Sequence, residues 1–245
     1  MNIKQLLDMA KIKPNPGMDQ YFLADDSVLD KEVSLAKLSS KDTVLEIGAG
    51  IGNLTIRLSK KAHVIAVEKD YSFMSILKGI GNCDAVFGDA LEFLESLRSS
   101  KGGGFNKIVS NIPYSISQPL LLEFFRHRWS IAVLIVQKEF ADKLTSKERL
   151  GMLMKDIAEV KTDRQIPAGA FYPAAVPSSL LVIKQKKLLD DDFWNFLCSL
   201  RPNKNVSNQV RKSGRLGSKK THQLALAELK ELYKLNQKQQ VNSAA

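Results

Sequence analysis

The sequence predicts an α/β protein built on a parallel, doubly wound sheet, and three observations lead to this fold class. Apolar strand segments alternate with amphipathic helical segments over residues 40–184, an order that makes successive strands parallel neighbours. The first strand runs directly into a glycine-rich turn and a helix, which is how such folds build ligand sites. From residue 188 the pattern changes to two helices around a basic stretch, so we expect a main domain over 1–187 and a small helical domain over 188–245.

The N-terminal segment, residues 1–19, is polar and contains Pro14 and Pro16, so we expect an extended lead-in. Asp25, Asp26 and Ser27 are candidate N-caps for the helix that follows, whose apolar residues recur at helical spacing. The first residues lack an apolar core, so we expect no signal peptide. The longest apolar run, Ile131–Val136, is too short to span a bilayer, so we expect no membrane partner.

The strand over Thr43–Ile47 leads into the turn Gly48-Ala49-Gly50-Ile51-Gly52. Glycine lets the backbone approach a ligand closely, and the N-terminus of the following helix favours a carboxylate or a phosphate. The next strand, His63–Val67, ends at Glu68, twenty residues past Gly48. An acidic side chain at this distance from the glycines can bind both hydroxyls of a ribose, although a simple surface charge is the alternative.

Two further strand ends carry polar side chains. The strand Ala85–Phe87 is followed by Asp89, which can accept from an adenine amine, cap the next helix, or do both. The fourth strand ends at Asn111-Ile112-Pro113-Tyr114, where the Asn111 oxygen and a nearby carbonyl can each accept one hydrogen of an exocyclic amine. Tyr114 can stack on a planar base. An ordinary strand-ending turn is the alternative, since Asn and Pro are common in turns.

The remaining elements follow the same periodicities. The sequence predicts a buried strand over Ile131–Val136, an antiparallel pair of strands without an intervening helix within 158–184, and a frayed end over 236–245. The aromatic residues Phe193, Trp194 and Phe196 recur at helical spacing and are more consistent with a core than with base stacking. The predicted later helices are Gln118–Arg128, Lys138–Leu144, Arg149–Ile157, Asp190–Leu200 and Leu224–Leu235.

Charge is distributed unevenly along the chain. The net charge is +10, and residues 184–245 carry 13 Lys/Arg against 5 Asp/Glu, which accounts for +8 of it. A basic tail on a nearly neutral body is typical of a nucleic-acid-binding segment, with a solubilising tail as the alternative. The candidate phosphate contacts are Arg201, Lys204, Arg211, Lys212, Arg215, Lys219 and Lys220.

The positions of the cysteines and histidines bear on disulfide formation and metal binding. Cys83 and Cys198 lie far apart in apolar contexts, so we expect reduced core residues of a cytoplasmic protein. His63, His127 and His222 have no metal-ligand spacing, so we expect no metal.

Taken in order, the glycine turn, Glu68, Asp89 and Asn111–Tyr114 resemble the motifs of class I S-adenosylmethionine-dependent methyltransferases. More narrowly, residues 17–212 resemble the KsgA-type small-subunit rRNA adenine N6,N6-dimethyltransferases. Gln20–Leu23 resembles this family's Gln-x-Phe-Leu signature, with Tyr21 in place of the common Asn.

Two later stretches add to this resemblance. Phe171-Tyr172-Pro173 resembles the start of the family's Phe-x-Pro-x-Pro-x-Val-x-Ser loop, in which Ala175 replaces the second Pro and Ser178 stands where Asp is usual. Phe196–Asn208 resembles the basic stretch of the family's C-terminal domain, with Pro202 in place of an arginine.

The resemblance implies a Rossmann-like class I methyltransferase sheet with S-adenosylmethionine as the cofactor. Gly48 and Gly50 would approach the methionine part of the cofactor, Glu68 would bind its ribose and Asp89 its adenine. Tyr21 and Leu23 would close the pocket.

The resemblance also implies the substrate. Asn111, Pro113, Tyr114 and Phe171 would hold the target adenine, with Asn111 also facing the cofactor. The target would be two adjacent adenines in the 3′-terminal hairpin loop of small-subunit rRNA, within an immature small ribosomal subunit. We expect the protein to act as a monomer.

Other functions remain open on the sequence alone. An Erm-like enzyme acting on large-subunit rRNA shares the same motifs, and a methyltransferase for a DNA adenine or a protein glutamine shares Asn-x-Pro-Tyr. A ribosome-assembly factor whose binding matters more than its turnover is the non-enzyme alternative.

Overall fold

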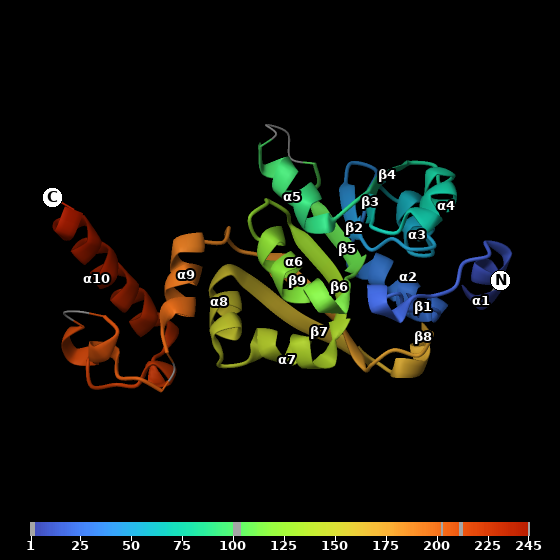
Figure 1. Cartoon of the computed structure of the whole chain (residues 1–245). Helices are drawn as coiled ribbons and strands as arrows, with labels where there is room; N and C mark the ends of the chain where they lie inside the picture. The colour runs from blue at the N-terminus through green and yellow to red at the C-terminus, as the bar shows by residue number, and fades with distance from the viewer. Residues whose placement is uncertain (1–2, 100–103, 202, 211–212, 245) are drawn as a thin grey trace. The chain divides into compact units, whose positions relative to one another are not determined.

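The computed structural model describes residues 3–99, 104–201, 203–210 and 213–244 (Figure 1). The chain forms two compact units. One comprises Met1–Asp142 and Ile157–Leu188, and the other comprises Lys143–Asp156 and Leu189–Ala245. The division into two domains between residues 187 and 188 stays a prediction. The second unit also includes a segment from the middle of the chain, Lys143–Asp156.

In the first unit the described residues form a seven-stranded sheet with the order β4-β3-β2-β5-β6-β9-β7. Strands β2 to β6 are parallel to one another, while β9 runs antiparallel to both β6 and β7. This confirms the predicted doubly wound sheet and the predicted antiparallel pair. The strands are β2 Thr43–Ile47, β3 His63–Glu68, β4 Cys83–Phe87, β5 Lys107–Asn111, β6 Ile131–Gln137, β7 Ala158–Ile166 and β9 Ser178–Gln185.

Aspartate side chains cap two of the helical segments. Asp25 accepts hydrogen bonds from the backbone N–H groups of Ser27 and Val28 and so caps α2, while Asp70 caps the turn that precedes α4. The predicted helices over 138–144 and 149–157 are also present. The helices of this part of the chain are α2 Asp26–Leu35, α3 Thr55–Ser59, α4 Met74–Lys78, α5 Ala90–Ser99, α6 Ser117–Phe124, α7 Lys138–Thr145 and α8 Arg149–Ile157.

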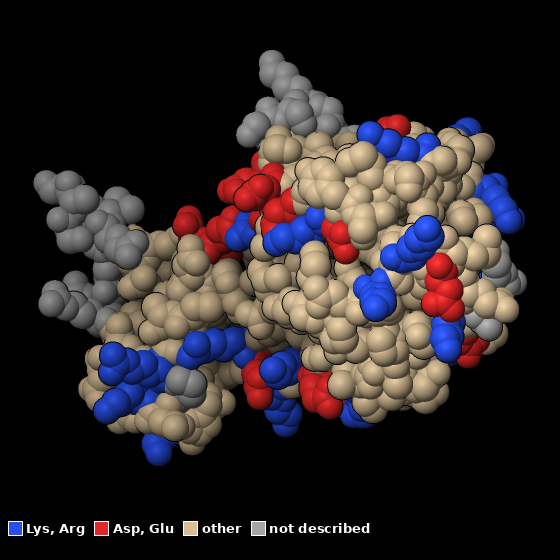
Figure 2. Space-filling model, turned by 45° about the vertical axis from the view of Figure 1, so that its right-hand side comes forward, with Lys and Arg blue, Asp and Glu red and all other residues tan. Residues whose placement is uncertain are grey.

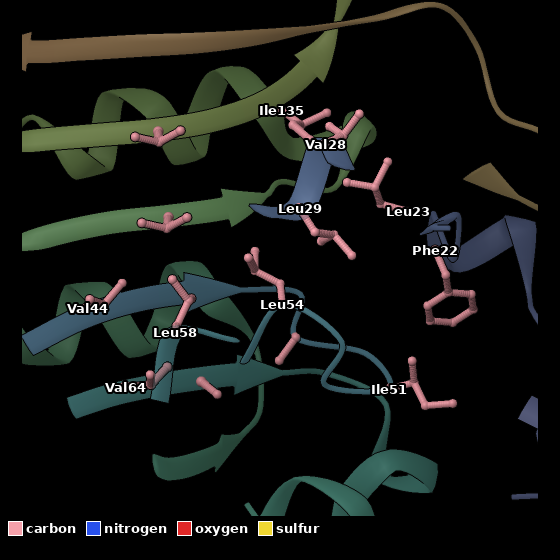
Figure 3. Packing of buried hydrophobic residues seen from close by; sticks show 14 of the residues in the cluster. Phe22, Leu23, Val28, Leu29, Val44, Ile51, Leu54, Leu58, Val64 and Ile135 are labelled. Carbon is pink, nitrogen blue, oxygen red and sulfur yellow. The ribbon is translucent and has the colours of Figure 1, made fainter. Parts of the chain in front are cut away.

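One buried cluster fixes α2, α3 and α4 on a single face of the sheet. Val28 and Leu29 of α2 and Leu58 of α3 pack with Val44 of β2 and Val64 of β3 (Figure 3). The helical and strand periodicities bring these residues to one layer, so the elements that carry the glycine turn and the strand ends are held rigidly.

The N-terminal segment is not the extended lead-in that its polarity and prolines predict. Helix α1 spans Ile3–Met9, and its residues Ile3 and Leu7, one turn apart, join the buried cluster. That short apolar stripe gives the helix a buried face, and tertiary packing outweighs the polar composition. Strand β1, Phe22–Leu23, then pairs with β8, Phe171–Tyr172, in a separate two-stranded sheet.

The second unit is helical and has an aromatic core. Helix α9, Asp191–Ser199, is capped by Asp190, and helix α10 is Leu226–Ala244. Phe193 and Phe196 of α9 are buried and lie 5.3 and 5.4 Å, by ring centroids, from Tyr233 of α10. Phe193 and Phe196 are therefore core residues, as predicted, whereas Trp194 is only half-buried.

Two expectations for this unit are wrong. Cys198 is exposed, because it follows the buried Phe196 and Leu197 and lies off the apolar stripe of α9, whereas Cys83 is half-buried; both are free thiols. The region over 236–244 continues α10, since nothing in its sequence breaks a helix. Among the described residues no helix is both long and apolar enough to cross a bilayer.

Candidate active site

A cavity of about 270 Å³ opens in the first unit at the carboxyl ends of β2, β3, β4 and β5. This is the edge at which open α/β sheets bind ligands. The structure brings eight of the predicted site residues together in its wall, namely Tyr21, Leu23, Gly48, Gly50, Glu68, Asp89, Asn111 and Pro113.

All three glycines of the turn have a positive φ, and two of them, Gly48 and Gly50, line the cavity. Gly48 and Gly50 have φ of 72° and 52°, in the left-handed region that disfavours other residues. A Cβ on Gly50 would also lie 2.8 Å from the ring of Phe22. The turn can therefore follow this path along the cavity only because side chains are absent there.

Glu68 connects the end of β3 to this turn. One carboxylate oxygen accepts from the backbone N–H of Gly50 at 2.8 Å, and the other accepts from the N–H of Asp70 at 2.8 Å. Burial raises the pKa of Glu68, and these N–H groups act against that rise. These bonds orient the carboxylate, and its two oxygens have enough acceptor sites to accept from ligand hydroxyls as well.

Asp89 does cap helix α5, and it remains at the cavity wall. Its Oδ1 accepts from the backbone N–H groups of Leu91 and Glu92, while Oδ2 pairs with the Lys69 ammonium at 3.2 Å. Burial acts to raise the pKa of Asp89, but Lys69 and the backbone donors outweigh it and leave that pKa below its usual value. The carboxylate therefore stays ionised and can accept from an amine.

Asn111 is the last residue of β5, and its Oδ1 atom is buried without a hydrogen-bond partner. The strand end is held in place by Ser110, whose hydroxyl donates to the Ile47 carbonyl at 2.7 Å. A buried amide oxygen that lacks a partner is costly, so its natural partner is a ligand donor. The carbonyl of Pro113 accepts from the Ser117 hydroxyl at 3.0 Å and has a second lone pair remaining.

Tyr114 lies beside the cavity, outside its wall. Its ring stacks on Tyr21 with centroids 6.0 Å apart and planes 19° apart, and its hydroxyl hydrogen-bonds the Ser178 hydroxyl at 2.9 Å. Burial raises the pKa of the Tyr114 phenol, so the ring stays neutral. The Ser178 hydroxyl therefore supports the aromatic ring.

Phe171 is not brought into the cavity wall. It is only 5% exposed, pairs with Leu23 in the β1–β8 sheet and belongs to the buried cluster. An aromatic side chain in a loop is equally suited to a core or to a base platform, and the sequence does not separate the two. A role for Phe171 in holding a base stays a prediction, and its observed contacts are those of a core residue.

Several wall residues are missing from the sequence prediction. Asp19 accepts from the Ser115 backbone N–H at 2.9 Å, and Asn53 donates to the Leu23 carbonyl at 2.7 Å. The Gln20 side chain donates to Asp70 at 2.7 Å. These contacts pin the N-terminal segment across the strand ends. Only the Gln-x-Phe-Leu signature pointed to this segment, since such long-range contacts leave no local pattern.

The predicted RNA contacts lie in the second unit as far as the structure describes them. Arg201, Lys204, Lys219 and Lys220 are exposed. Arg215 belongs to the short turn Gly214–Leu216, whereas Arg211 and Lys212 lie outside the described residues.

The side chain of Gln209 organises the basic segment. It donates to the carbonyls of Arg201 and Lys204 at 3.1 and 3.2 Å and to the Thr221 hydroxyl at 2.8 Å. Lysine and arginine side chains gather on the visible face of this unit (Figure 2).

Among the residues that the structure describes, no three His, Cys, Asp or Glu side chains are placed to hold a metal ion. The donor set of the cavity is instead one of carboxylate, amide and backbone groups.

The fold and the cavity define a class I methyltransferase, which confirms the predicted fold class. The solved structures agree: a dimethyladenosine transferase from Plasmodium falciparum superposes with a TM-score of 0.74 at 25% identity, covering 89% of this chain and 98% of that one. The 23S rRNA methyltransferase ErmE shares the fold with a TM-score of 0.61 at 20% identity, over 88% of this chain and 99% of that one.

Sequence comparison identifies the family. The family model described as ribosomal RNA adenine dimethylase matches residues 12–244. A probable ribosomal RNA small subunit methyltransferase A of Thermococcus sibiricus is 35% identical over 76% of this chain and 69% of its own length. A protein of the same description in Methanosarcina mazei is 39% identical over 74% and 68%. The chain belongs to the ribosomal RNA adenine dimethylase family, as the sequence motifs predicted.

Proposed function

We propose that the protein transfers methyl groups from S-adenosylmethionine to the N6 atoms of two adjacent adenines in the 3′-terminal hairpin loop of small-subunit rRNA. The observation that carries this proposal is the buried, unpartnered Oδ1 of Asn111 at the cavity, since a hydrogen-bond acceptor there suits an exocyclic amine. Family membership and the names of the relatives from Thermococcus and Methanosarcina support the RNA class and the small subunit.

The residues of the cavity fit S-adenosylmethionine. The glycine turn leaves room for a ligand, Glu68 offers acceptors for ribose hydroxyls, and the ionised Asp89 offers one for the adenine amine. When bound, this cofactor supplies an electrophilic methyl group on a sulfonium. The chain's own residues bind and orient it, and they exclude water from the strand ends.

The work at the substrate is done by positioning and electrostatics. The adenine amine is a poor nucleophile because its lone pair is delocalised into the ring. The Oδ1 of Asn111 and a carbonyl of the Ile112-Pro113 segment accept the amine hydrogens and draw the lone pair out of conjugation. Positive charge that builds on N6 is stabilised by the same acceptors, and the proton leaves after transfer. The stacked rings of Tyr114 and Tyr21 provide a flat surface for the base.

The basic segment of the second unit binds the RNA backbone in this proposal. The exposed Arg201, Lys204, Lys219 and Lys220 offer phosphate contacts, and the loop position of the target adenines lets them leave their stack. The substrate is the immature small ribosomal subunit, on which the protein acts as a monomer in the cytoplasm and takes part in ribosome biogenesis.

The test is transfer of labelled methyl groups from S-adenosylmethionine to unmethylated, immature small subunits, followed by mapping of the label. We expect dimethyladenine at two adjacent positions of the 3′-terminal hairpin. Label in large-subunit RNA would favour an Erm-like target instead. Tight binding to small subunits that survives loss of Asn111, with no transfer, would favour an assembly factor.

A further inference from the structure

Two glutamates are buried in the layer between the sheet and helices α2 and α3. Glu32 is 0% exposed and Glu46 is 2% exposed. Both carboxyl oxygens of Glu32 and one of Glu46 are buried without a hydrogen-bond partner in the protein. Desolvation penalises the charged form of such groups, so a buried carboxyl without a partner favours its protonated state.

Strand and helix periodicity place these side chains together. Glu46 lies two residues after Val44 and so points to the same face of β2, and Glu32 lies one helical turn after Val28 on α2. Val28 and Val44 belong to one buried cluster (Figure 3). Thr55 enters the same layer as the buried first residue of α3.

The groups that face Glu46 set its pKa. Burial raises the pKa of Glu46 to about 8; the charge of Glu68 adds to this rise, while the Thr55 hydroxyl opposes it. Burial, reinforced by the charge of Glu46, raises the pKa of Glu32 well above its usual value. On β4, burial followed by the charges of Glu46 and Asp84 raises the pKa of the Cys83 thiol to about 11. Glu46 is therefore poised to titrate close to neutral pH.

Glu46 also lines the cavity, whereas Glu32 does not. We infer that Glu46 is protonated in the ligand-free protein and releases its proton to solvent when the cationic cofactor binds, so that it favours the sulfonium-bearing cofactor over the neutral thioether by-product. This inference rests on the proposed use of S-adenosylmethionine. The inference gives a specificity role to Glu46, a buried acid that has no role in the proposed methyl transfer.

The sign of the linkage follows from charge. A positive ligand stabilises the carboxylate form and lowers the pKa of Glu46 in the complex. Affinity for S-adenosylmethionine therefore rises with pH up to about 8, where half of the Glu46 side chains are ionised in the ligand-free protein, and it levels off above that pH. Between pH 6.5 and 8 the gain is on the order of tenfold, because each pH unit is worth at most a factor of ten per proton. S-Adenosylhomocysteine lacks the sulfonium charge and should show a smaller dependence.

The test is calorimetric titration of the whole protein with each ligand at pH 7, in two buffers of different ionisation enthalpy. The dependence of the heat on the buffer gives the number of protons released. For S-adenosylmethionine we expect a substantial fraction of one proton from the wild type and clearly less from Glu46→Gln. Glu32→Gln is the matched control, because glutamine resembles a glutamate that stays protonated, and it should release as many protons as the wild type. The ligand's own amino group titrates in every variant, so it cancels in the comparison.

Equal proton release from the wild type and Glu46→Gln, or equal release for cofactor and by-product, would overturn the inference while leaving the proposed function intact. Loss of proton release in Glu32→Gln would show that the proton comes from Glu32, and this result would also overturn the inference. No heat of cofactor binding in the wild type would refute the proposed function and this inference together. Thermal unfolding of each variant shows whether the fold is retained.

Discussion

At the scale of single residues, the amide oxygen of Asn111 is the acceptor on which the proposed chemistry depends. We expect Asn111→Ala to keep affinity for S-adenosylmethionine within a few-fold but to lose turnover by a factor on the order of 10²–10³, since one positioned acceptor is worth about that much. Cofactor titration and methyl transfer to immature small subunits measure the two effects. Unchanged turnover would remove Asn111 from the mechanism.

Gly50 gives a second prediction at this scale. Gly50→Ala places a Cβ 2.8 Å from the Phe22 ring at a φ of 52°, and it disturbs the N–H that Glu68 accepts. We expect cofactor affinity to fall by at least tenfold, which is about 1.4 kcal/mol of binding free energy. Gly81→Ala is the matched control, because a Cβ there meets nothing within 4 Å and should leave affinity unchanged. Equal affinity in both variants would contradict a close approach at the turn.

The residues that the sequence could predict are those that end strands. Glu68, Asp89 and Asn111 each follow an apolar run, and parallel strands bring such ends to one edge of the sheet. Asp19 and Asn53 could not be predicted in the same way, because their contacts join segments that only the folded chain brings together. The burial of Phe171 could not be predicted either, because it depends on pairing with a strand that is distant in the sequence.

At the scale of elements, the basic segment of the second unit should act through charge. We expect Lys204→Ala combined with Lys220→Ala to weaken RNA binding and to lower the slope of log affinity against log salt by about 1–2, as each lost phosphate contact predicts. Binding to the hairpin RNA at several salt concentrations measures this slope. The control is the double change Lys41→Ala and Lys78→Ala, two exposed lysines of the first unit. Identical salt slopes in both double variants would indicate that the basic segment only keeps the protein soluble.

Elements with a strong period were predictable, whereas those held only by tertiary contacts were not. The strands over 43–47 and 131–136 and the helix over 149–157 come directly from their apolar patterns. Helix α1 was missed because two buried residues, Ile3 and Leu7, are too few to mark a helix within a polar stretch. The two-residue strands β1 and β8 carry no period at all.

At the scale of the whole molecule, the two buried glutamates make stability depend on pH. Their pKa values are raised on folding, so their protonated forms stabilise the fold below about pH 4.5, and this contribution is lost as pH rises towards about 8 for Glu46. At pH 8.5 we expect Glu46→Gln to have a free energy of unfolding higher than that of the wild type by on the order of a few kcal/mol. Its unfolding temperature should be higher as well. At pH 5 the difference should be small. A difference that does not vary with pH would contradict a protonated Glu46.

The pairing of β1 with β8 has a consequence for how the protein is made. Residues 22–23 form part of the cavity wall, yet their strand partner lies about 150 residues later in the chain. A growing chain on the ribosome therefore carries the glycine turn, Glu68 and Asn111 well before the wall that encloses a cofactor can close. The wall segment therefore gains its strand partner only in chains that have been translated past Tyr172.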